Sequence, residues 1–315
     1  MSSQVPRLVC LGNFTVDDVY LPDGTVAPNC MGGNALYAAL GARLWEPRVQ
    51  IVAPLSPNIP SSTFDAMREV GFDPHTLPLR EMPVIHNRVY YDADGGRRWE
   101  NNTTLEEFRI LSPCPEDIPP SYLDAEAFLI LAMALEAQEE LISWLKEHTK
   151  AIVALDTQED YVAGNEERIR RLISQVDICL PSTIEVTNLL GHADLPEAAQ
   201  EIAEFGPPLV VIKNGKDGAL IYDCGSDSWF IQPAQPGQVV DTTGAGDSFC
   251  GGFMAAYLQN GNDLRRAALA GSISASYAVA SFGMKALLGA RSEDADQILQ
   301  QKYSLDESAK HSRSR

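Results

Sequence analysis

The residues of this sequence whose types and spacing could do chemistry form a glycine-rich stretch, Asp-Thr-Thr-Gly-Ala-Gly-Asp, at positions 241–247. A short β-branched run precedes it, and an Ala-rich segment of helical pattern follows. Glycines allow successive backbone N–H groups to converge, and a helix N-terminus adds positive partial charge, so this turn predicts an anion site. Asp247 would stand beside the bound anion. Its carboxylate could accept the proton of a hydroxyl that attacks phosphorus, which is the chemistry of phosphoryl transfer.

Competing motifs are absent from the sequence or incomplete. There is no Gly-x4-Gly-Lys-Ser/Thr stretch, and no Gly-x-Gly-x-x-Gly follows the first predicted strand. Residues 246–250 read Gly-Asp-Ser-Phe-Cys, and the Cys replaces the second Gly of a nucleophile elbow, so Ser248 is a poor candidate nucleophile. A lone Gly-x-Gly-Asp would more often be an ordinary helix start. The full seven-residue string at a strand–helix junction favours the chemical interpretation.

The composition limits the partners of the chain. It has 315 residues, with 24 Lys and Arg against 43 Asp and Glu, and a net charge of −19. This acid surplus argues against binding to nucleic acid and to a membrane surface of anionic lipid. The longest strongly apolar run, Phe128–Leu135, is far shorter than the roughly 20 residues of a membrane-spanning helix. No signal-peptide pattern opens the sequence and the six cysteines form no Cys-x-x-Cys pair, so we expect a cytoplasmic protein with reduced thiols.

Strand and helix patterns alternate along most of the chain. Apolar runs typical of buried strands lie at 7–12, 49–54, 128–133, 151–156, 177–180 and 209–213. Helical patterns lie at 33–45, 61–71, 136–148, 166–175, 247–259 and 263–280. Such alternation predicts an α/β fold with a mostly parallel sheet and a ligand site at the carboxyl ends of its strands. Residues 84–104 instead predict an antiparallel hairpin, residues 22–28 turns, and the polar segment 306–315 a disordered tail.

Several motifs together resemble a known family. The string at 241–249 is similar to the C-terminal signature of the ribokinase-like (PfkB) carbohydrate kinases. Other features follow in the family's order over roughly residues 7–290: a first strand with Asp17 after it, the pair Gly32-Gly33 opening an Ala-rich helix, and the hairpin at the position of the family's lid. The resemblance implies a ribokinase-like fold, with a central mostly parallel sheet flanked by helices and a small β lid. It also implies a single domain over 1–305, with lid segments around 14–30 and 84–110.

The resemblance implies catalytic and substrate-binding roles as well. Asp247 would be the general base on the substrate hydroxyl. Backbone N–H groups for the phosphoryl group transferred from ATP would come from Gly244, Ala245 and Gly246. The sugar would be held by Asp17, Gly33 and Asn34.

Nucleotide and metal contacts are implied in the same way. The stretch 213–218 resembles the family's strand–turn–strand that touches the nucleotide, through Lys213, Gly215 and Gly218. Glu185 would bear on Mg²⁺. A monovalent cation such as K⁺ would be bound by Asp241 and Thr243, with backbone near 280–283 completing its site.

Two positions depart from the family pattern. Ser182 stands where Asn is usual in Asn-x-x-Glu, and its shorter side chain leaves the affinity for metal and the placement of phosphate open. The Gly-Gly pair runs directly into Asn34-Ala-Leu-Tyr37, without the longer form that carries a later Asn, which leaves the substrate contacts there open.

Some of these residues also have ordinary structural interpretations. Asp17 could belong to a solvated turn, and Glu185 could be a first-turn helix acid. Lys213 is more typical of a solvated lysine than of a phosphate ligand. The hairpin arginines, Arg88, Arg97 and Arg98, are more typical of charges that protect an edge strand than of substrate ligands.

The sequence thus predicts an ATP- and Mg²⁺-dependent kinase that phosphorylates a small sugar, with a homodimer through the exposed lid edge as one possible assembly. A nucleoside is the alternative acceptor, which would be favoured if lid or pocket aromatics stack on a base, the candidates being Tyr37, Tyr90, Tyr91 and Trp99. A non-catalytic ligand-binding relative is an alternative of a different class, and the intact Asp247 argues against it.

Overall fold

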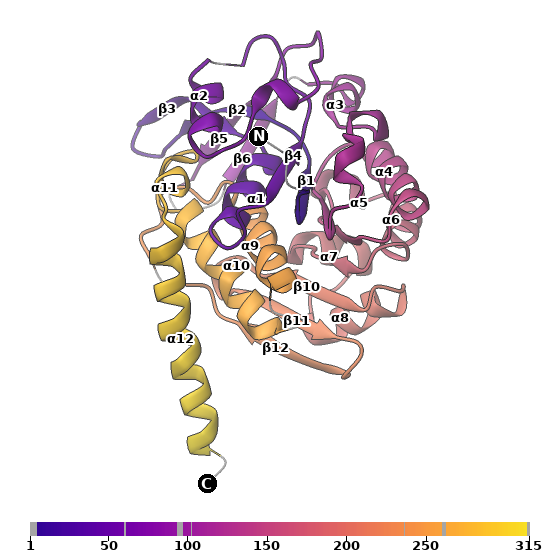
Figure 1. Cartoon of the computed structure of the whole chain (residues 1–315), viewed down its shortest axis with the longest axis vertical. Coiled ribbons are helices and arrows are strands. Elements are labelled where there is room, and N and C mark those ends of the chain that lie inside the picture. Colours follow the sequence, from indigo (N-terminus) through magenta and orange to yellow (C-terminus); the bar gives the residue numbers. More distant parts are fainter. Residues whose placement is uncertain are drawn as a thin grey trace.

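An eight-stranded sheet runs through the protein, and a separate four-stranded sheet lies at one end of it (Figure 1). This computed structural model describes residues 5–59, 61–92, 97–101, 103–235, 237–259 and 263–313. The large sheet has the order β12-β11-β10-β9-β8-β7-β1-β4. Its strands are β1 (Leu8–Leu11), β4 (Val49–Val52), β7 (Ala127–Ile130), β8 (Ile152–Leu155), β9 (Ile178–Cys179), β10 (Leu209–Lys213), β11 (Ala219–Asp223) and β12 (Ser228–Gln232). Neighbours from β4 to β10 pair in parallel, and β11 and β12 add to one edge in antiparallel pairing.

Helices cover both faces of this sheet. In β1, Leu8 and Cys10 belong to one buried apolar cluster and Val9 and Leu11 to the other, as expected for a strand buried on both faces. The first cluster includes residues of α1 (Asn34–Arg43), α2 (Ser61–Glu69), α9 (Ala245–Gln259), α10 (Leu264–Ala278), α11 (Lys285–Leu288) and α12 (Ser292–Arg313). The second includes residues of α4 (Leu135–His148), α5 (Glu159–Val162), α6 (Glu166–Ile173), α7 (Thr183–Leu190) and α8 (Leu195–Glu204). The predicted α/β fold is therefore confirmed.

Close packing of α1 on α9 fixes the start of α9. A Cβ on Gly251 would overlap the backbone of Ala38, and a Cβ on Gly41 would lie 2.5 Å from the carbonyl oxygen of Ser248. Only glycine allows the two helices to approach this far. The hydroxyl of Ser248 also donates to the carbonyl of Tyr37 at 3.2 Å. These contacts hold the first turn of α9, which carries Asp247, against α1.

The smaller sheet corresponds to the predicted lid and has the order β3-β2-β5-β6. Its strands are β2 (Thr15–Tyr20), β3 (Val26–Gly32), β5 (Ile85–Tyr91) and β6 (Arg97–Asn101). The antiparallel hairpin predicted within 84–104 is confirmed as β5 and β6, and residues 93–96 and 102 lie outside the described range. The prediction of turns across 22–28 was too broad, because β3 already begins at Val26. Pro28 is compatible with β3 because that strand lies at an edge of the sheet and need not donate to a neighbour there.

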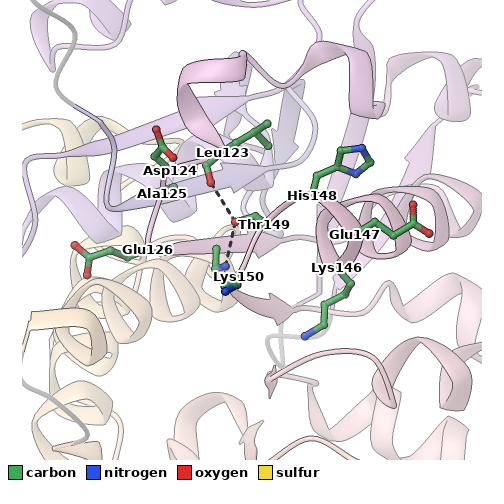
Figure 2. A pocket seen from close by; sticks show the side chains of 10 residues that line it. Leu123, Asp124, Ala125, Glu126, Lys146, Glu147, His148, Thr149 and Lys150 are labelled. Carbon is green, nitrogen blue, oxygen red and sulfur yellow. Dashed lines mark hydrogen bonds between the residues drawn. The ribbon is translucent and has the colours of Figure 1, made fainter.

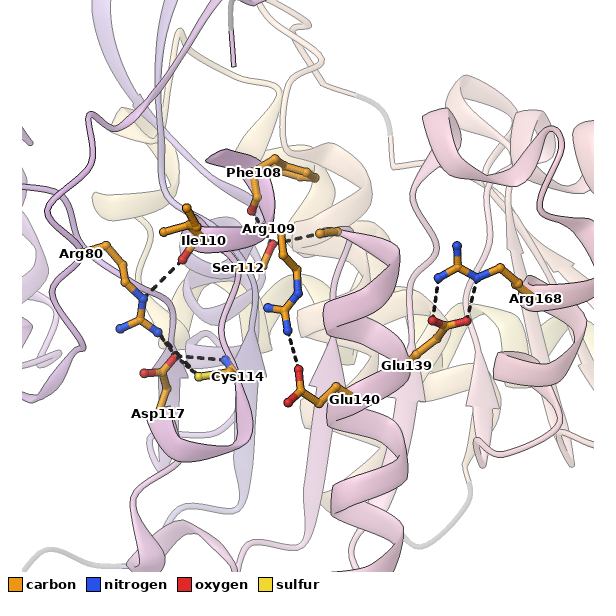
Figure 3. A network of polar contacts seen from close by, with 11 residues as sticks. Arg80, Phe108, Arg109, Ile110, Ser112, Cys114, Asp117, Glu139, Glu140 and Arg168 are labelled. Atoms are coloured by element: carbon orange, nitrogen blue, oxygen red, sulfur yellow. Dashed lines mark hydrogen bonds and ion pairs between the residues drawn. The ribbon is translucent and has the colours of Figure 1, made fainter. Parts of the chain in front are cut away.

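Polar contacts anchor the segment that leaves the lid. Helix α3 (Leu105–Leu111) follows β6, and Figure 3 shows Arg80 donating to the carbonyl of Ile110 at 3.3 Å and pairing with Asp117 at 2.5 Å. In the same view Arg109 of α3 pairs with Glu140 of α4. Four short 3₁₀ turns complete the described secondary structure: η1 (Pro74–Thr76), η2 (Pro115–Asp117), η3 (Pro120–Tyr122) and η4 (Gly215–Asp217).

Helix α12 leaves the two sheets and runs toward the C-terminus (Figure 1). It extends to Arg313, so a helix includes residues 306–313 of the segment for which the sequence predicts disorder, and residues 314–315 lie outside the described range. Within the described residues, no helix combines the length and the apolar character needed to cross a membrane.

Candidate active site

The glycine-rich turn leads directly into α9. Gly244 has a φ of 74°, a left-handed conformation that favours glycine, and a Cβ there would overlap the ring of Tyr37. The helix begins at Ala245, and the N–H of Ser248 donates to the carbonyl of Gly244 at 2.9 Å. Residues 244–247 are partly exposed, whereas their neighbours on both sides are buried. We call residues 244–246 the anion turn, because these partly exposed residues lie at the start of a long helix.

The carboxylates of Asp17, Asp241 and Asp247 lie near Tyr37. The phenol is buried, and its pKa is raised well above the ordinary value, mainly by burial and further by the nearby carboxylates of Asp241, Asp17 and Asp247. Asp247 lies in the first turn of α9, as the sequence predicts. The residues proposed to bind the acceptor and to act as base are thus close enough to influence one buried side chain.

Asp17 of β2 is buried rather than solvated. The residue is only 3% exposed, and its carboxylate accepts a hydrogen bond from the side chain of Asn87 of β5 at 2.8 Å. Burial raises the pKa of Asp17 to about 6, and the nearby Asp241 adds to this increase, while hydrogen bonds from Asn87 and Thr15 oppose it. The interpretation of Asp17 as a solvated turn residue is therefore wrong.

Gly33 and Asn34 stand at the start of α1. Gly33 has a φ of 110°, and a Cβ there would overlap the backbone near Asn13. The side-chain oxygen of Asn34 accepts from the N–H of Asn13 at 2.9 Å, and its amide nitrogen donates to the carbonyl of Ala132. Both polar groups of Asn34 thus tie the chain segments after β1 and β7 together. A role of Gly33 and Asn34 in holding the substrate stays a prediction.

Lys213 is not the solvated lysine that its residue type favours. It ends β10, its side chain is 13% exposed, and its ammonium lies 2.5 Å from Oδ1 of Asp156, which follows β8. Burial acts to lower the pKa of Lys213, but the carboxylate of Asp156, with Cys250 and Glu185, holds it above the ordinary value. A Cβ added to Gly246 would be 3.7 Å from the ammonium, so this cation lies directly against the anion turn.

Glu185 belongs to the same buried cluster. It sits at the third position of α7, where the hydroxyl of Ser182 caps the helix by accepting from the N–H of Glu185 at 3.4 Å. Oε2 of Glu185 accepts from the N–H of Ser182 at 2.7 Å and from the hydroxyl of Thr157 at 2.9 Å. Burial raises the pKa of Glu185 to about 7 and Asp156 adds to this, although the ammonium of Lys213 opposes it. A solvated first-turn acid would not be held in this way.

Asp241 and Thr243 form a second polar site at the start of the anion turn. Asp241 is 2% exposed and its Oδ1 accepts from the N–H of Thr243 at 2.9 Å. The N–H groups of Val240 and Asp241 donate to the carbonyl of Val279, at 2.8 and 3.3 Å, which brings the segment after α10 beside them. The hydroxyl of Thr243 is buried and has no hydrogen-bond partner among the described residues.

The turn between β10 and β11 carries Gly215 and Gly218. Both have positive φ, of 53° and 97°, and a Cβ on Gly218 would overlap the carbonyl of Gln232. The N–H of Asn214 donates to the carbonyl of Gly218 at 2.7 Å and closes the turn. These glycines are needed for the turn itself, and their contact with a nucleotide stays a prediction.

The hollow drawn in Figure 2 lies away from this site. It is lined by residues before β7 and by the end of α4, including Glu126, Thr149 and Lys150. These positions lie at the amino ends of β7 and β8. Ligands bind at the carboxyl ends of strands in sheets of this kind, and Asp156, Lys213 and the anion turn lie at that edge. We therefore place the candidate active site at the anion turn.

Comparison with known proteins decides the family. Residues 101–289 match the profile of the family described as pfkB family carbohydrate kinase. The chain belongs to the PfkB family. It is therefore an ATP-dependent phosphotransferase. The cytidine kinase of Thermococcus kodakarensis is similar to this PfkB kinase, with 29% identity over 79% of this chain and 88% of the relative. A nucleoside kinase of Methanothermobacter thermautotrophicus is 33% identical over 42% of this chain and 41% of its own.

Solved structures share the fold of this PfkB kinase. A putative ribokinase II from E. coli, described in complex with ATP and Mg²⁺, matches with a TM-score of 0.77 at 20% identity, over 94% of this chain and all of that one. The nucleoside kinase of Burkholderia thailandensis, in complex with inosine, matches with a TM-score of 0.73 at 17% identity, over 94% and 98% of the two chains. The likeness confirms the ribokinase-like fold.

Sequence reasoning missed Asn87 and Asp156 of this PfkB kinase, and it considered Tyr91 only as a residue that could stack on a base. Asp156 directly follows a predicted buried strand, and a carboxylate at the carboxyl end of a parallel strand is a signal that could have found it. Asn87 and Tyr91 lie on one face of β5, within the predicted strand 84–92. Nothing in the sequence alone shows that their face of the strand is the one turned toward Asp17 and Asp241.

Proposed function

We propose that this PfkB kinase transfers the γ-phosphoryl group of ATP to a hydroxyl of a nucleoside, with Asp247 as the general base. The observation that carries the proposal is the position of Asp247 in the first turn of α9, beside the partly exposed anion turn and near the same buried phenol, Tyr37, as Asp17. A carboxylate in this position can accept the hydroxyl proton while backbone N–H groups and the helix start stabilise the charge on the phosphoryl group.

Different residues of the chain would orient the acceptor and stabilise the transferring phosphoryl group. Asp17, held by Asn87, would accept hydrogen bonds from acceptor hydroxyls and so orient the acceptor. The N–H groups of the anion turn would point at the transferring phosphoryl oxygens. Lys213, held in place by Asp156, would add a positive charge next to Gly246. Each group is held by packing or by a hydrogen bond, which is the preorganisation that phosphoryl transfer requires.

The donor set fits a magnesium ion in part. Mg²⁺ is commonly bound through one or two carboxylates together with phosphates and water, and Glu185 and Asp156 are two acids of one buried cluster. These residues would hold the ion, directly or through water, and the ion would neutralise phosphate charge. No group of three or more His, Cys, Asp or Glu suited to a metal occurs among the described residues, in keeping with an ion that the nucleotide helps to bind.

Asp241 and Thr243 fit a monovalent cation. The buried Thr243 hydroxyl lacks a hydrogen-bond partner within the described part of the chain, and Asp241 supplies a buried carboxylate next to it. We infer that K⁺ would bind to Asp241 and Thr243 and would thereby help to fix the conformation of the anion turn that follows them. Stimulation of turnover by KCl, and not by the same concentration of LiCl, is the expected result. Equal rates in the two salts would contradict this assignment.

A nucleoside is the acceptor that we favour over a free sugar. The relative that aligns with 79% of the chain is named a cytidine kinase. In the lid, Trp99 is 41% exposed, whereas Tyr37 is buried and Tyr90 stacks on Tyr20 at 4.7 Å between ring centres. Tyr91 is engaged with Asp241. Of the four aromatic residues that the sequence offers for stacking, Trp99 is the most exposed.

The test is turnover of ATP with Mg²⁺ across a panel of nucleosides and sugars, for the wild type and Asp247→Asn. We expect a nucleoside to give the highest kcat/KM and Asp247→Asn to lose at least about 100-fold in kcat. Glu197→Gln is the matched control, because Glu197 is an exposed first-turn acid of α8.

Near-wild-type turnover of Asp247→Asn would show that Asp247 is not the general base. Thermal stabilisation by one ligand without any ATP consumption would instead favour a non-catalytic binding protein. A sugar preferred over every nucleoside would overturn the acceptor class. Homodimerisation through the lid stays a prediction, to be checked by sedimentation.

A further inference from the structure

One residue of the lid contacts the start of the anion turn directly. Tyr91, the last residue of β5, donates its hydroxyl to Oδ1 of Asp241 at 2.6 Å. The same phenol oxygen accepts from the N–H of Thr242 at 3.1 Å and lies 3.3 Å from the Thr242 hydroxyl. One phenol therefore bonds to two consecutive residues of the loop that precedes Gly244.

Strand alternation explains why Tyr91 can do this. Residues 87, 89 and 91 share one face of β5, and on that face Asn87 donates to Asp17. Tyr90 lies on the opposite face, where it stacks on Tyr20 with the guanidinium of Arg98 over its ring at 4.5 Å. The face of β5 that holds the proposed acceptor-binding carboxylate thus also carries the contact to the anion turn.

Asp241 connects this contact to the catalytic backbone. Its Oδ1 accepts from both Tyr91 and the N–H of Thr243, the residue immediately before Gly244. Its own N–H is held by the carbonyl of Val279 after α10. A hydroxyl bonded to a buried carboxylate is among the stronger hydrogen bonds in proteins. Losing it would leave the Asp241 carboxylate with fewer donors in a site that is almost closed to water.

We propose that Tyr91 is a positioning residue, whose phenol fixes the anion turn when the lid lies over the acceptor. This proposal rests on the proposed function. It makes correct placement of the phosphoryl-binding N–H groups depend on the lid strand that also holds Asn87 against Asp17. When the lid does not lie over an acceptor, Tyr91 would not hold the anion turn, and the turn would be less ordered. Water would then attack ATP less readily than a bound acceptor does.

The test compares Tyr91→Phe with Tyr90→Phe. The first removes only the bridging hydroxyl. The second makes the same chemical change one residue earlier, on the other face of β5. For Tyr91→Phe we expect kcat to fall about 10- to 100-fold, with the KM for ATP changed less than threefold, and ATP hydrolysis to rise as a share of total turnover. Tyr90→Phe should keep both quantities within about twofold. Equal kinetics for the two variants would overturn the proposal.

A measurement independent of turnover separates this proposal from the proposed function. Hydrogen exchange of the backbone amides of Thr242 and Thr243 should be faster in Tyr91→Phe than in the wild type or in Tyr90→Phe, because their partners are the phenol and the carboxylate that it orders. If no acceptor is phosphorylated yet these amides are selectively deprotected, the proposed function fails and the contact stands. If the amides exchange at the same rate in all three proteins, the positioning role is wrong, whatever the acceptor.

Discussion

The ammonium of Lys213 lies 2.5 Å from Oδ1 of Asp156. Lys213 ends β10 and Asp156 follows β8, and β9 lies between these two strands in the sheet. The side chains are 13% and 4% exposed. The ammonium also lies close to the position where Gly246 would carry a Cβ. A positive charge is thus held against the anion turn by a carboxylate, and neither side chain can move without leaving the other charge buried.

Breaking this pair should cost stability, whereas removing both charges should cost mainly activity. Lys213→Met and Asp156→Asn should each lower the free energy of unfolding by about 3–5 kcal/mol, because each leaves one buried charge unpaired. The double variant should recover part of that loss in urea unfolding, since neither member of the pair is left charged without the other. Its kcat should remain well below that of the wild type. Wild-type kcat in the double variant would show that the lysine charge takes no part in transfer.

Two glycines of the anion turn should respond differently to alanine. At Gly246 a Cβ would make only ordinary contact, 3.7 Å from Lys213, so Gly246→Ala should change the free energy of unfolding by no more than about 1 kcal/mol. Its kcat should still fall sharply, because the methyl group would stand where we propose that phosphate oxygens approach. Gly244→Ala should instead lower the melting temperature, because Gly244 has a φ of 74° and no room beside Tyr37. Melting curves and initial rates for both variants check this, and equal loss of stability would refute the distinction.

The ionised carboxylate of Asp17 should lower the stability of the protein at neutral pH while it improves binding of the acceptor. Burial raises its pKa to about 6, above the 3.8 of an unfolded chain, so the folded state holds the proton more tightly. Its contribution to stability is therefore greatest at low pH and is lost as pH rises from about 4 to about 6. Asp17→Asn should raise the free energy of unfolding at pH 7, by at most about 3 kcal/mol.

The same substitution should raise the KM for the acceptor. In the wild type, that KM should increase as pH falls below about 6, because the protonated carboxyl accepts fewer hydrogen bonds. Asp18→Asn is the control, since Asp18 pairs with His86 at 3.1 Å. Measurements of KM from pH 5 to 8 would contradict the assignment if Asp17→Asn kept the wild-type pH profile.

Local patterns predicted much of the fold but not the contacts between distant segments. Buried apolar runs identified the strands of the parallel sheet because such strands are apolar on both faces. The lid strands β2 and β3 were missed, since Asp17, Asp18 and Pro28 interrupt any regular alternation. Helix α12 was missed because its sequence is polar over most of its length.

For the site, the string at 241–247 located the anion turn because its glycines and helix start act within a few residues. Lys213 shows where such reasoning ends. Its burial depends on Asp156, 57 positions away, and no local pattern reveals that a carboxylate will meet it. Tyr91 and Asp241 are 150 positions apart, and only the folded lid brings them together.

Ser182 offers a test of one of the two positions at which the sequence departs from the pattern that it resembles. Its hydroxyl caps α7 by accepting from the N–H of Glu185, and Asn is an equally good cap. Ser182→Asn should therefore keep the stability of the protein within about 0.5 kcal/mol, while its longer side chain would reach further toward the place where we propose that the phosphates and Mg²⁺ bind. We expect the Mg²⁺ concentration that gives half-maximal turnover to fall. Ser182→Ala removes the cap and should cost about 1 kcal/mol of stability, and it serves as the matched comparison. If Ser182→Asn and the wild type need the same Mg²⁺ concentration, residue 182 does not bear on the metal, and its role is limited to starting the helix that holds Glu185.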